Sequence, residues 1–225
     1  MRTVVISLGG SLIFPGKIAV DFLKDFIGII KQFAKQNKVV IVCGGGTLAR
    51  EYITAASQLV ECDDVTKDWL GIGATRQNAL LVQSLFGEDV YEHIVQDPTE
   101  PFTTSKHIIV GAGWKPGFST DMGAVKLAEL LHADEVINMS NITHVYDKDP
   151  RVHPDARKQD QLTWDAFKAI VGETWKPGMN APFDPIASSV AAELKLKVII
   201  IGNDISNLSD CLNNQPFVGT TISQH

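Results

Sequence analysis

Short apolar runs alternate along this chain with longer segments in which apolar residues recur every three or four positions. The short runs are rich in Val and Ile, and they predict buried strands in five segments: Thr3–Leu8, Lys38–Cys43, His107–Val110, Glu135–Met139 and Lys197–Ile201. Because apolar residues fill these runs without alternation, both faces of the predicted sheet should be covered.

The longer segments predict helices between the strands. One set of residues at helical spacing forms an apolar face that we expect to pack on the sheet rather than on a partner: Phe22, Leu23, Phe26, Ile27, Ile30 and Phe33. Further helices are predicted through Arg50 and Tyr52, over Asp68–Phe86, and over Asp121–Leu131 with Thr120 as the cap. Strands separated by helices predict an α/β fold, a three-layer αβα sandwich with a mostly parallel central sheet.

Three of the predicted strands run into glycine-rich loops, at Gly9-Gly10-Ser11, Gly44-Gly45-Gly46 and Gly111-Ala112-Gly113. The carboxyl ends of parallel strands meet at one sheet edge, where ligands bind. Glycine lets the backbone approach a phosphate and turn its N–H groups toward it, and a following helix adds its dipole. One such loop is often only a tight turn, but three at one edge favour a ligand with several phosphates.

Motifs of several other enzyme classes are absent from the sequence. It has no G-x-x-x-x-G-K-[ST] loop and no G-x-G-x-x-G after the first strand, which disfavours P-loop and dinucleotide enzymes. It also lacks the G-x-S-x-G and H-E-x-x-H patterns of hydrolytic enzymes.

Length and composition fit one globular domain over residues 1–225, with 44% hydrophobic and 20% charged residues. A net charge of −6 without a basic stripe argues against a nucleic-acid polymer as partner. Cys43, Cys62 and Cys211 have neither disulfide nor zinc-site spacing, so reduced thiols and a cytoplasmic location are expected. No apolar run approaches a membrane span. Polar segments at Asp147–Gln161 and Trp175–Pro185 predict excursions from the sheet.

Longer segments of the sequence narrow the interpretation of the glycine loops. The first two loops, Arg50 four residues after the second, and a Ser-Thr-Asp sequence at a predicted helix start together resemble the amino-acid-kinase family. Four segments resemble one branch of it, the archaeal-type UMP kinases: Asp68–Leu81, Gly111–Asp121, Ser140–Pro150 and Phe183–Ala187. With the closing Gly-Thr-Thr-Ile, the resemblance covers essentially the whole chain in order.

The resemblance implies a kinase that transfers the γ-phosphoryl group of ATP to UMP, with Mg²⁺ accompanying ATP. It implies that the two nucleotides lie head to head across the strand ends, with a phosphate-acceptor half at about residues 1–135 and an ATP-binding half at about residues 136–225. Kinases of this family usually form homo-oligomers, often hexamers. The sequence assigns no metal ligand.

The resemblance also carries roles to individual positions. It implies that Asp121 and Arg50 are catalytic. Positions that match ATP contacts are Ser7, Leu8, Gly9, Gly10, Ser11, Gly46, Arg50, Ser140, Asn141, Tyr146 and Asp149. Positions that match UMP contacts are Gly45, Asp68, Gly113, Trp114, Lys115, Pro116, Gly117, Phe118, Ser119 and Thr120. Structural alternatives stay open for several of these, namely a surface arginine at Arg50, a helix cap at Asp68 and a solvated charge at Lys115.

Two positions depart from the family pattern. Ser7 stands where many members carry a lysine that neutralises the moving phosphoryl group, and Lys17, Lys106 or Lys115 would have to compensate. Thr143 and His144 stand where relatives often have Asp-Gly, and a turn that needs a positive φ would be strained by a histidine.

Two other functions remain open at this point. The chain could be a family member with a different small acceptor, such as an isopentenyl phosphate, carbamate or an amino-acid carboxylate. The isoprenoid kinases have a histidine near the phosphate, and the glycine loops here contain none. The chain could also be a non-catalytic nucleotide-binding protein on the same fold, for which Ser7 is the best support.

Overall fold

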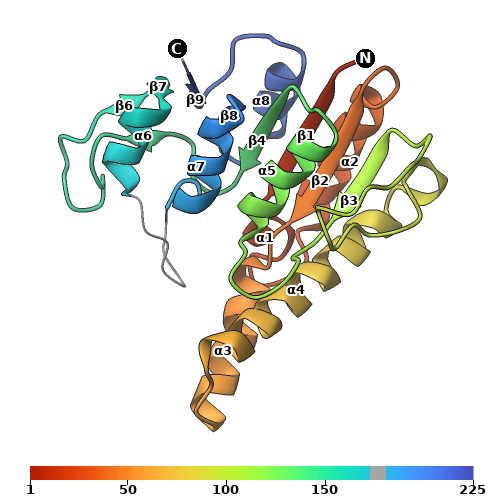
Figure 1. The fold of residues 1–225 in the computed structure, drawn as a ribbon, viewed down its shortest axis with the longest axis horizontal. Coiled ribbons are helices and arrows are strands. Elements are labelled where there is room, and N and C mark those ends of the chain that lie inside the picture. The colour runs from red at the N-terminus through yellow and green to blue at the C-terminus, as the bar shows by residue number, and fades with distance from the viewer. Residues whose placement is uncertain (173–180, 225) are drawn as a thin grey trace.

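The computed structural model describes residues 1–172 and 181–224, which form one α/β body (Figure 1). The elements run in chain order as β1 (Thr3–Leu8), α1 (Gly10–Ile13), α2 (Val20–Phe33), β2 (Lys38–Cys43), α3 (Gly46–Leu59), α4 (Asp64–Ser84), the short 3₁₀ turn Gly87–Asp89, β3 (Ile108–Gly111), α5 (Thr120–Leu130), β4 (Glu135–Met139), β5 (Val145–Tyr146), β6 (Lys158–Gln159), β7 (Gln161–Thr163), α6 (Trp164–Val171), α7 (Pro185–Glu193), β8 (Lys197–Ile201), α8 (Ile205–Leu212) and β9 (Thr220–Ser223).

The central sheet has the strand order β3-β2-β1-β4-β8-β9-β7, and its strands pair in parallel except for β8 with β9. The five strands predicted from apolar runs all belong to it, so the mostly parallel sheet is confirmed. The predicted excursion at Asp147–Gln161 leaves the sheet and carries β5 and β6, which form a small antiparallel pair. Of the second predicted excursion, residues 175–180 lie outside the described residues.

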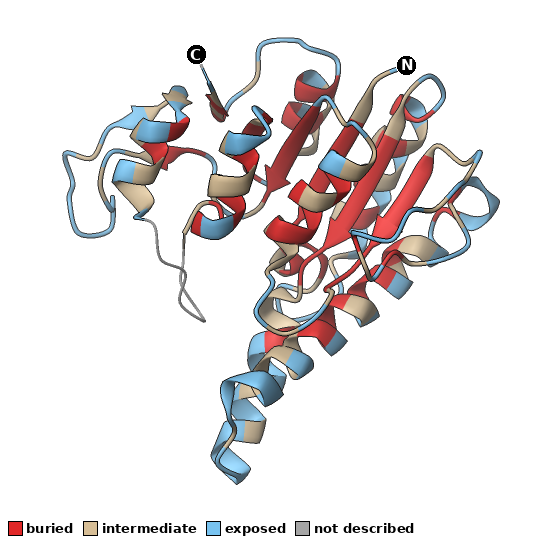
Figure 2. Cartoon of the chain, in the orientation of Figure 1, coloured by how far each residue is buried: buried red, intermediate tan, exposed pale blue. Residues whose placement is uncertain are grey.

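Helices cover both faces of the sheet, which confirms the three-layer sandwich. Alternate residues of β1 enter opposite cores: Val4 and Ile6 pack with α2, α4 and α8, whereas Val5 packs with α5, α6 and α7. The predicted apolar face of α2 lies on the sheet, with Phe26 and Ile30 fully buried. In Figure 2 the strands at the centre are accordingly almost wholly buried.

Helices α3 and α4 form an arm that extends away from the sheet (Figure 1). Of α3, only Ala49 is buried, and much of the arm is exposed in Figure 2. Five large apolar side chains of the arm are exposed: Tyr52, Leu59, Val60, Val65 and Trp69. This apolar surface finds no cover within the described part of the chain.

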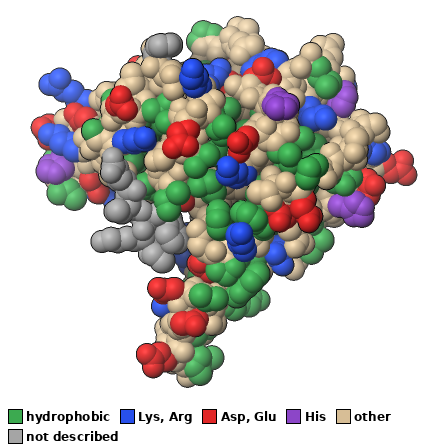
Figure 3. Space-filling view, in the orientation of Figure 1, with side chains coloured by type: hydrophobic (Ala, Val, Ile, Leu, Met, Phe, Trp, Pro, Cys, Tyr) green, Lys and Arg blue, Asp and Glu red, His purple; other side chains and the backbone are tan. Residues whose placement is uncertain are grey.

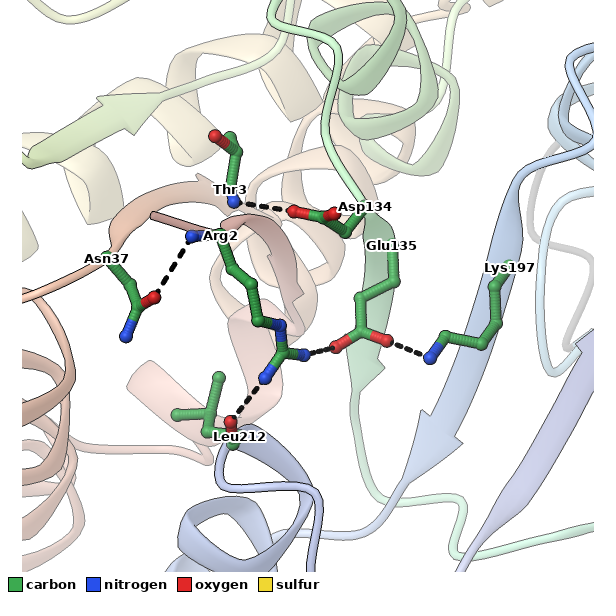
Figure 4. A network of polar contacts seen from close by, with 7 residues as sticks. All are labelled: Arg2, Thr3, Asn37, Asp134, Glu135, Lys197 and Leu212. Carbon is green, nitrogen blue, oxygen red and sulfur yellow. Dashed lines mark hydrogen bonds and ion pairs between the residues drawn. The ribbon is translucent and has the colours of Figure 1, made fainter.

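A charged network lies at the amino ends of the strands, opposite the glycine loops (Figure 4). Glu135, at the start of β4, is 1% exposed and pairs with Arg2 at 2.7 Å and with Lys197 at the start of β8. Arg2 also donates to the carbonyl oxygen of Leu212 at 2.9 Å. Because a buried carboxylate needs such partners, the network joins the chain start to β4, β8 and α8.

Two predicted helix starts were wrong by a short distance. Helix α4 begins at Asp64 rather than Asp68, because the carboxylate of Asp63 caps it by accepting from the Thr66 N–H at 2.7 Å. The predicted cap Thr120 is instead the first residue of α5, and Ser119 caps that helix by accepting from the Met122 N–H. In the described ranges, no helix combines the length and apolar character needed to cross a membrane.

Candidate functional site

The first two glycine loops pack backbone against backbone at the carboxyl edge of the sheet. A Cβ atom on Gly10 would collide with the backbone of Gly44 and Gly45, and one on Gly46 with the backbone of Gly10 and Ser11. Gly46 also has a φ of +56°, which side-chain-bearing residues rarely adopt. These glycines therefore bring the starts of α1 and α3 together, so that the orphan first-turn N–H groups of α3 face the same edge as the Gly9–Ser11 loop.

Arg50 extends from α3 back over these loops. Its Nη2 donates to the hydroxyl of Ser11 at 3.1 Å and to that of Thr47 at 2.9 Å. The side chain is exposed, but both hydroxyl partners hold its guanidinium beside the loops. A fixed guanidinium beside N–H-rich loops is suited to binding phosphate oxygens.

Asp121, in the first turn of α5, lies at the centre of a group of polar contacts. The Ser7 hydroxyl donates to its Oδ1 at 2.9 Å, and the Asp184 N–H donates to its Oδ2 at 3.1 Å. Asn138 of β4 lies 3.5 Å from the same Oδ1 and donates to the carbonyl oxygen of Pro182 at 3.0 Å. The structure thus brings the carboxylate of Asp121 to the end of β1, beside β4 and the start of α7.

Burial and, to a smaller extent, the nearby charge of Asp184 raise the pKa of Asp121 to about 6, against the lowering effect of the hydrogen bonds from Ser7 and the Asp184 N–H. A carboxylate made this basic holds a cation or a proton more readily than a solvated one. Raised carboxylate pKa values of this kind gather at functional sites.

The loop after β3 is held against α4 on the other side of the glycine loops. The Gly113 N–H donates to the Thr75 hydroxyl at 2.8 Å, and Arg76 donates to the Trp114 carbonyl oxygen at 3.2 Å. Asp68 accepts from the Gly117 N–H at 2.8 Å, so the helix-cap alternative for Asp68 is wrong. Apart from Gly45, which is the cap residue of α3, the positions matched to the acceptor therefore lie together, in the loop that leads into α5 and on the facing side of α4.

Lys115 folds over the aromatic side chains of its own loop. Its ammonium lies 3.8 Å from the centre of the Trp114 ring and 5.0 Å from that of Phe118, and the two rings are 4.7 Å apart. Such cation–π contacts hold the charge within the loop while leaving Lys115 exposed. Pro116 lies in the same loop, which ends at the Ser119 cap, and Thr120 is the first residue of α5.

A cavity of about 430 Å³ opens on the opposite side, after β4. Asn141, Tyr146 and Asp149 line it, with apolar walls from residues of α6 and from Pro182. Its size falls within the range of about 300–1,000 Å³ usual for small-molecule sites. Arg151 binds both carboxylate oxygens of Asp149, at 3.1 and 2.8 Å, and these bonds lower the pKa of Asp149 to about 2.

Three backbone and hydroxyl groups at the strand ends are already used within the fold. The Gly9 N–H donates to the Met139 carbonyl oxygen at 2.9 Å, and the Leu8 carbonyl oxygen accepts from the Gly44 N–H at 2.8 Å. The Ser140 hydroxyl accepts from the Ile142 N–H at 3.1 Å. These hydrogen bonds hold the loops in their conformation, so the three groups are engaged within the protein.

The proposed substitutes for a lysine at Ser7 lie in different places. Lys106 precedes β3 and donates to the Glu88 carbonyl oxygen, at the opposite end of the strands. Lys17 is exposed in the segment between α1 and α2. Of the three, only Lys115 lies within the loop at the carboxyl edge. The backbone strain that a positive φ would cause at His144 is also absent, because its φ is not positive.

Sequence reasoning missed the residues that orient the site. Asn138 and Asp184 support Asp121, Thr75 anchors Gly113, and Asn78 donates to the Gly44 carbonyl oxygen at 2.8 Å. A polar residue inside an apolar strand was a signal for Asn138. Within the described ranges, no group of three or more His, Cys, Asp or Glu side chains is arranged for a metal ion.

Comparisons with known proteins agree with this geometry. The family model described as "Amino acid kinase family" matches residues 2–202. Uridylate kinases of Methanoregula boonei and Pyrococcus abyssi are 36% and 35% identical over 216 and 223 residues, covering 94% and 97% of this chain and 92% and 98% of theirs. The crystal structure of uridylate kinase from Archaeoglobus fulgidus superposes with a TM-score of 0.85 at 33% identity, covering 99% of this chain and 100% of that one.

Proposed function

The chain belongs to the amino acid kinase family, and from that premise we propose that it is a UMP kinase, which transfers the γ-phosphoryl group of ATP to UMP to give UDP and ADP. Its curated relatives named uridylate kinase align over nearly their full length, so the activity concerns the whole chain rather than one part of it.

The order of the strands is the observation that supports this activity best. In the order β3-β2-β1-β4, the glycine loops of β1 and β2 lie between the loop after β3 and the cavity after β4. A nucleoside on each side would direct its phosphates toward the shared glycine loops. UMP belongs on the Gly113–Thr120 side and ATP on the Tyr146 side, as the two expected halves require.

Phosphoryl transfer through a loose transition state needs positioning and charge stabilisation more than a strong base. The acceptor oxygen belongs to a phosphate and is already anionic, so its proton needs no removal. Backbone N–H groups of the glycine loops and the guanidinium of Arg50 would stabilise the moving group. Asp121 would position cationic groups beside it, supported by Ser7 and Asp184.

The carboxylate of Asp121 fits the Mg²⁺ that accompanies ATP, whereas that of Asp184 already accepts from the Ile186 and Ala187 N–H groups as the cap of α7. Mg²⁺ is usually held by one or two carboxylates together with phosphate oxygens and water, rather than by a dedicated protein cage. Asp121 supplies one such carboxylate at the carboxyl edge, and no group of three or more potential ligands exists among the residues described. When bound there, the ion would neutralise phosphate charge during transfer.

We further propose a homo-oligomer, for which the exposed apolar side chains of the α3–α4 arm provide a surface. The three free thiols support a reducing, cytoplasmic location. On the face drawn in Figure 3, acidic and basic side chains are interspersed, in keeping with nucleotides rather than a nucleic-acid polymer as partners.

The first test is release of ADP by purified protein with Mg-ATP and UMP, CMP or dUMP. We expect turnover with UMP, and a loss of at least about 100-fold in Asp121→Asn, as for removal of a group that stabilises transition-state charge. Asp25→Asn, an exposed substitution on α2, is the control and should leave turnover unchanged.

ATP binding without turnover on UMP would contradict the proposal. Turnover on another small acceptor would then identify a different family activity. No turnover on any acceptor would favour a nucleotide-binding protein, for which the absence of a lysine at Ser7 is the specific reason.

A further inference from the structure

The excursion after β5 places the side chain of Arg151 in the wall of the 430 Å³ cavity. The excursion is closed at its base, where the Asp147 N–H donates to the Arg157 carbonyl oxygen at 3.1 Å and the Arg157 N–H donates to the Asp147 carboxylate at 2.8 Å. At its tip the Val152 N–H donates to the Asp149 carbonyl oxygen at 3.1 Å, which forms a tight turn around Arg151. The backbone that carries Arg151 is therefore held by hydrogen bonds at both places.

The carboxylate of Asp149 orients the guanidinium of Arg151. Its Oδ1 accepts from the Arg151 backbone N–H at 2.9 Å and from Nε at 3.1 Å, and its Oδ2 accepts from Nη2 at 2.8 Å. An exposed ion pair contributes little to stability, but a guanidinium bound along one edge by both carboxylate oxygens has a fixed plane. These three bonds use most of the roughly four lone-pair sites of the carboxylate, so little of Asp149 is left for a nucleotide.

The charged side chains that line this cavity are already paired. Arg151 pairs with Asp149, and Lys148 pairs with Asp155 at 2.6 Å, so neither pair has a net charge at neutral pH. Burial lowers the pKa of His144, whose ring therefore adds no charge to the wall. A polyphosphate finds no unpaired cation among the described side chains of the cavity. The cavity thus suits the nucleoside end of a nucleotide, while the phosphates belong at the glycine loops.

The free part of the Arg151 side chain is flat. Because Asp149 occupies the edge formed by Nε and Nη2, the two faces of the guanidinium and Nη1 are what remains for a ligand. Guanidinium faces stack on aromatic rings. Tyr146 of β5 and two apolar side chains of α6, Ile170 and Val171, line the same cavity. A planar base is the part of a nucleotide that such a surface binds best.

We propose that Arg151 binds the base of the nucleotide in this cavity by stacking a face of its guanidinium on the ring, and that Asp149 acts through Arg151 by positioning it. The inference rests on the proposed function, which puts ATP in this cavity. It adds a base-binding residue to the positions that the resemblance matched to ATP. It also makes Asp149, one of those positions, a positioning residue rather than a direct contact.

The test is calorimetric titration of ADP into the full chain without any acceptor, at low and at high salt. Arg151→Ala should weaken ADP binding by about tenfold, as loss of a stacking partner of a base does. Arg151→Lys keeps the charge but not the plane, so it should weaken binding to a similar extent. Both losses should persist at high salt, because salt screens a phosphate contact far more than a stacked base. Arg157→Ala, at an exposed arginine of the same excursion, is the matched control and should bind ADP as the wild type does.

Asp149→Asn tests the positioning role. It should weaken ADP binding by about three- to tenfold, and its combination with Arg151→Ala should bind no more weakly than Arg151→Ala alone, because both changes remove one contact. Losses that add, wild-type affinity in either Arg151 variant, a loss that disappears at high salt, or no binding of ADP would overturn the inference. Arg151-dependent binding of ADP without UMP turnover would uphold it while contradicting the proposed function.

Discussion

At the scale of the residue, burial makes the charged form of Asp121 unfavourable in the folded chain. Burial raises its pKa from an ordinary value near 3.8 to about 6, so the folded chain binds this proton more tightly than the unfolded chain does. Asp121 therefore contributes most favourably to the free energy of unfolding in acid, and this contribution is lost as the pH rises through about 4 to 6.

Asp121→Asn should accordingly gain stability relative to the wild type as the pH rises. The difference in free energy of unfolding should grow by about 1–3 kcal/mol in favour of the variant between pH 4 and pH 7. Asparagine keeps the contacts, because its amide oxygen can accept from the Asp184 N–H and its amide nitrogen can donate to the Ser7 hydroxyl. Chemical denaturation at several pH values measures this, and a pH-independent difference would contradict it.

Ser7 gives a second prediction at this scale, because its hydroxyl donates to Asp121. Ser7→Ala should lower kcat by about three- to tenfold with little change in either KM, since only the orientation of one carboxylate is lost. Ser105→Ala, at an exposed serine before β3, is the matched control. Steady-state kinetics with both nucleotides varied would decide, and an unchanged kcat would show that Ser7 does not position Asp121.

At the scale of the element, the contact between the glycine loops constrains two helix starts at once. Gly46→Ala should destabilise the fold by about 2 kcal/mol or more, because a Cβ atom would meet the backbone of Gly10 and because the φ of +56° is strained for alanine. Gly28→Ala is the matched control on α2, where an added Cβ meets nothing within 4 Å. It should stabilise by about 0.5–1 kcal/mol, and denaturant unfolding of both variants measures the contrast.

Elements were predictable where the sequence has a strong period or a long apolar run. β1 and β2 are buried on both faces, so nearly every residue in them is apolar, and no polar alternation was needed to find them. β5 and β6 are each two residues long, β6 carries only polar side chains, and β9 contains a single central apolar residue, Ile222. Their pairing depends on distant partners, which a local pattern does not contain.

The residues of the candidate site also fall into those that a local pattern predicts and those that it does not. Glycine loops and the segment around Asp121 are local patterns, and the resemblance carried them. The support of Asp121 by Asp184 joins residues 63 positions apart, and that of Gly113 by Thr75 joins residues 38 apart. Only the fold brings these pairs together, so no reading of the sequence alone could assign them.

At the scale of the whole molecule, the arm of α3 and α4 determines how chains can meet. Leu59, 82% exposed, lies at the end of α3 among other exposed apolar side chains. If the arm is the contact between copies, Leu59→Glu should shift the protein toward the monomer in sedimentation velocity, because a carboxylate would be buried without a partner. Val152→Glu, on an exposed valine of the excursion after β5, is the control and should not change the assembly. A wild type that sediments as a monomer would contradict the proposed oligomer.

The end of the same arm also carries a cysteine that can be labelled, Cys62. Burial raises the pKa of Cys211 to about 12 and raises that of Cys43 still further, so neither thiol readily gives the reactive thiolate. Cys62, between α3 and α4, is the one of the three cysteines that is not buried. A maleimide dye would therefore attach at this end of the arm without any engineering. Energy transfer between labelled chains would then report the distance between two arm ends, and slower labelling at higher protein concentration would report that a second copy covers them.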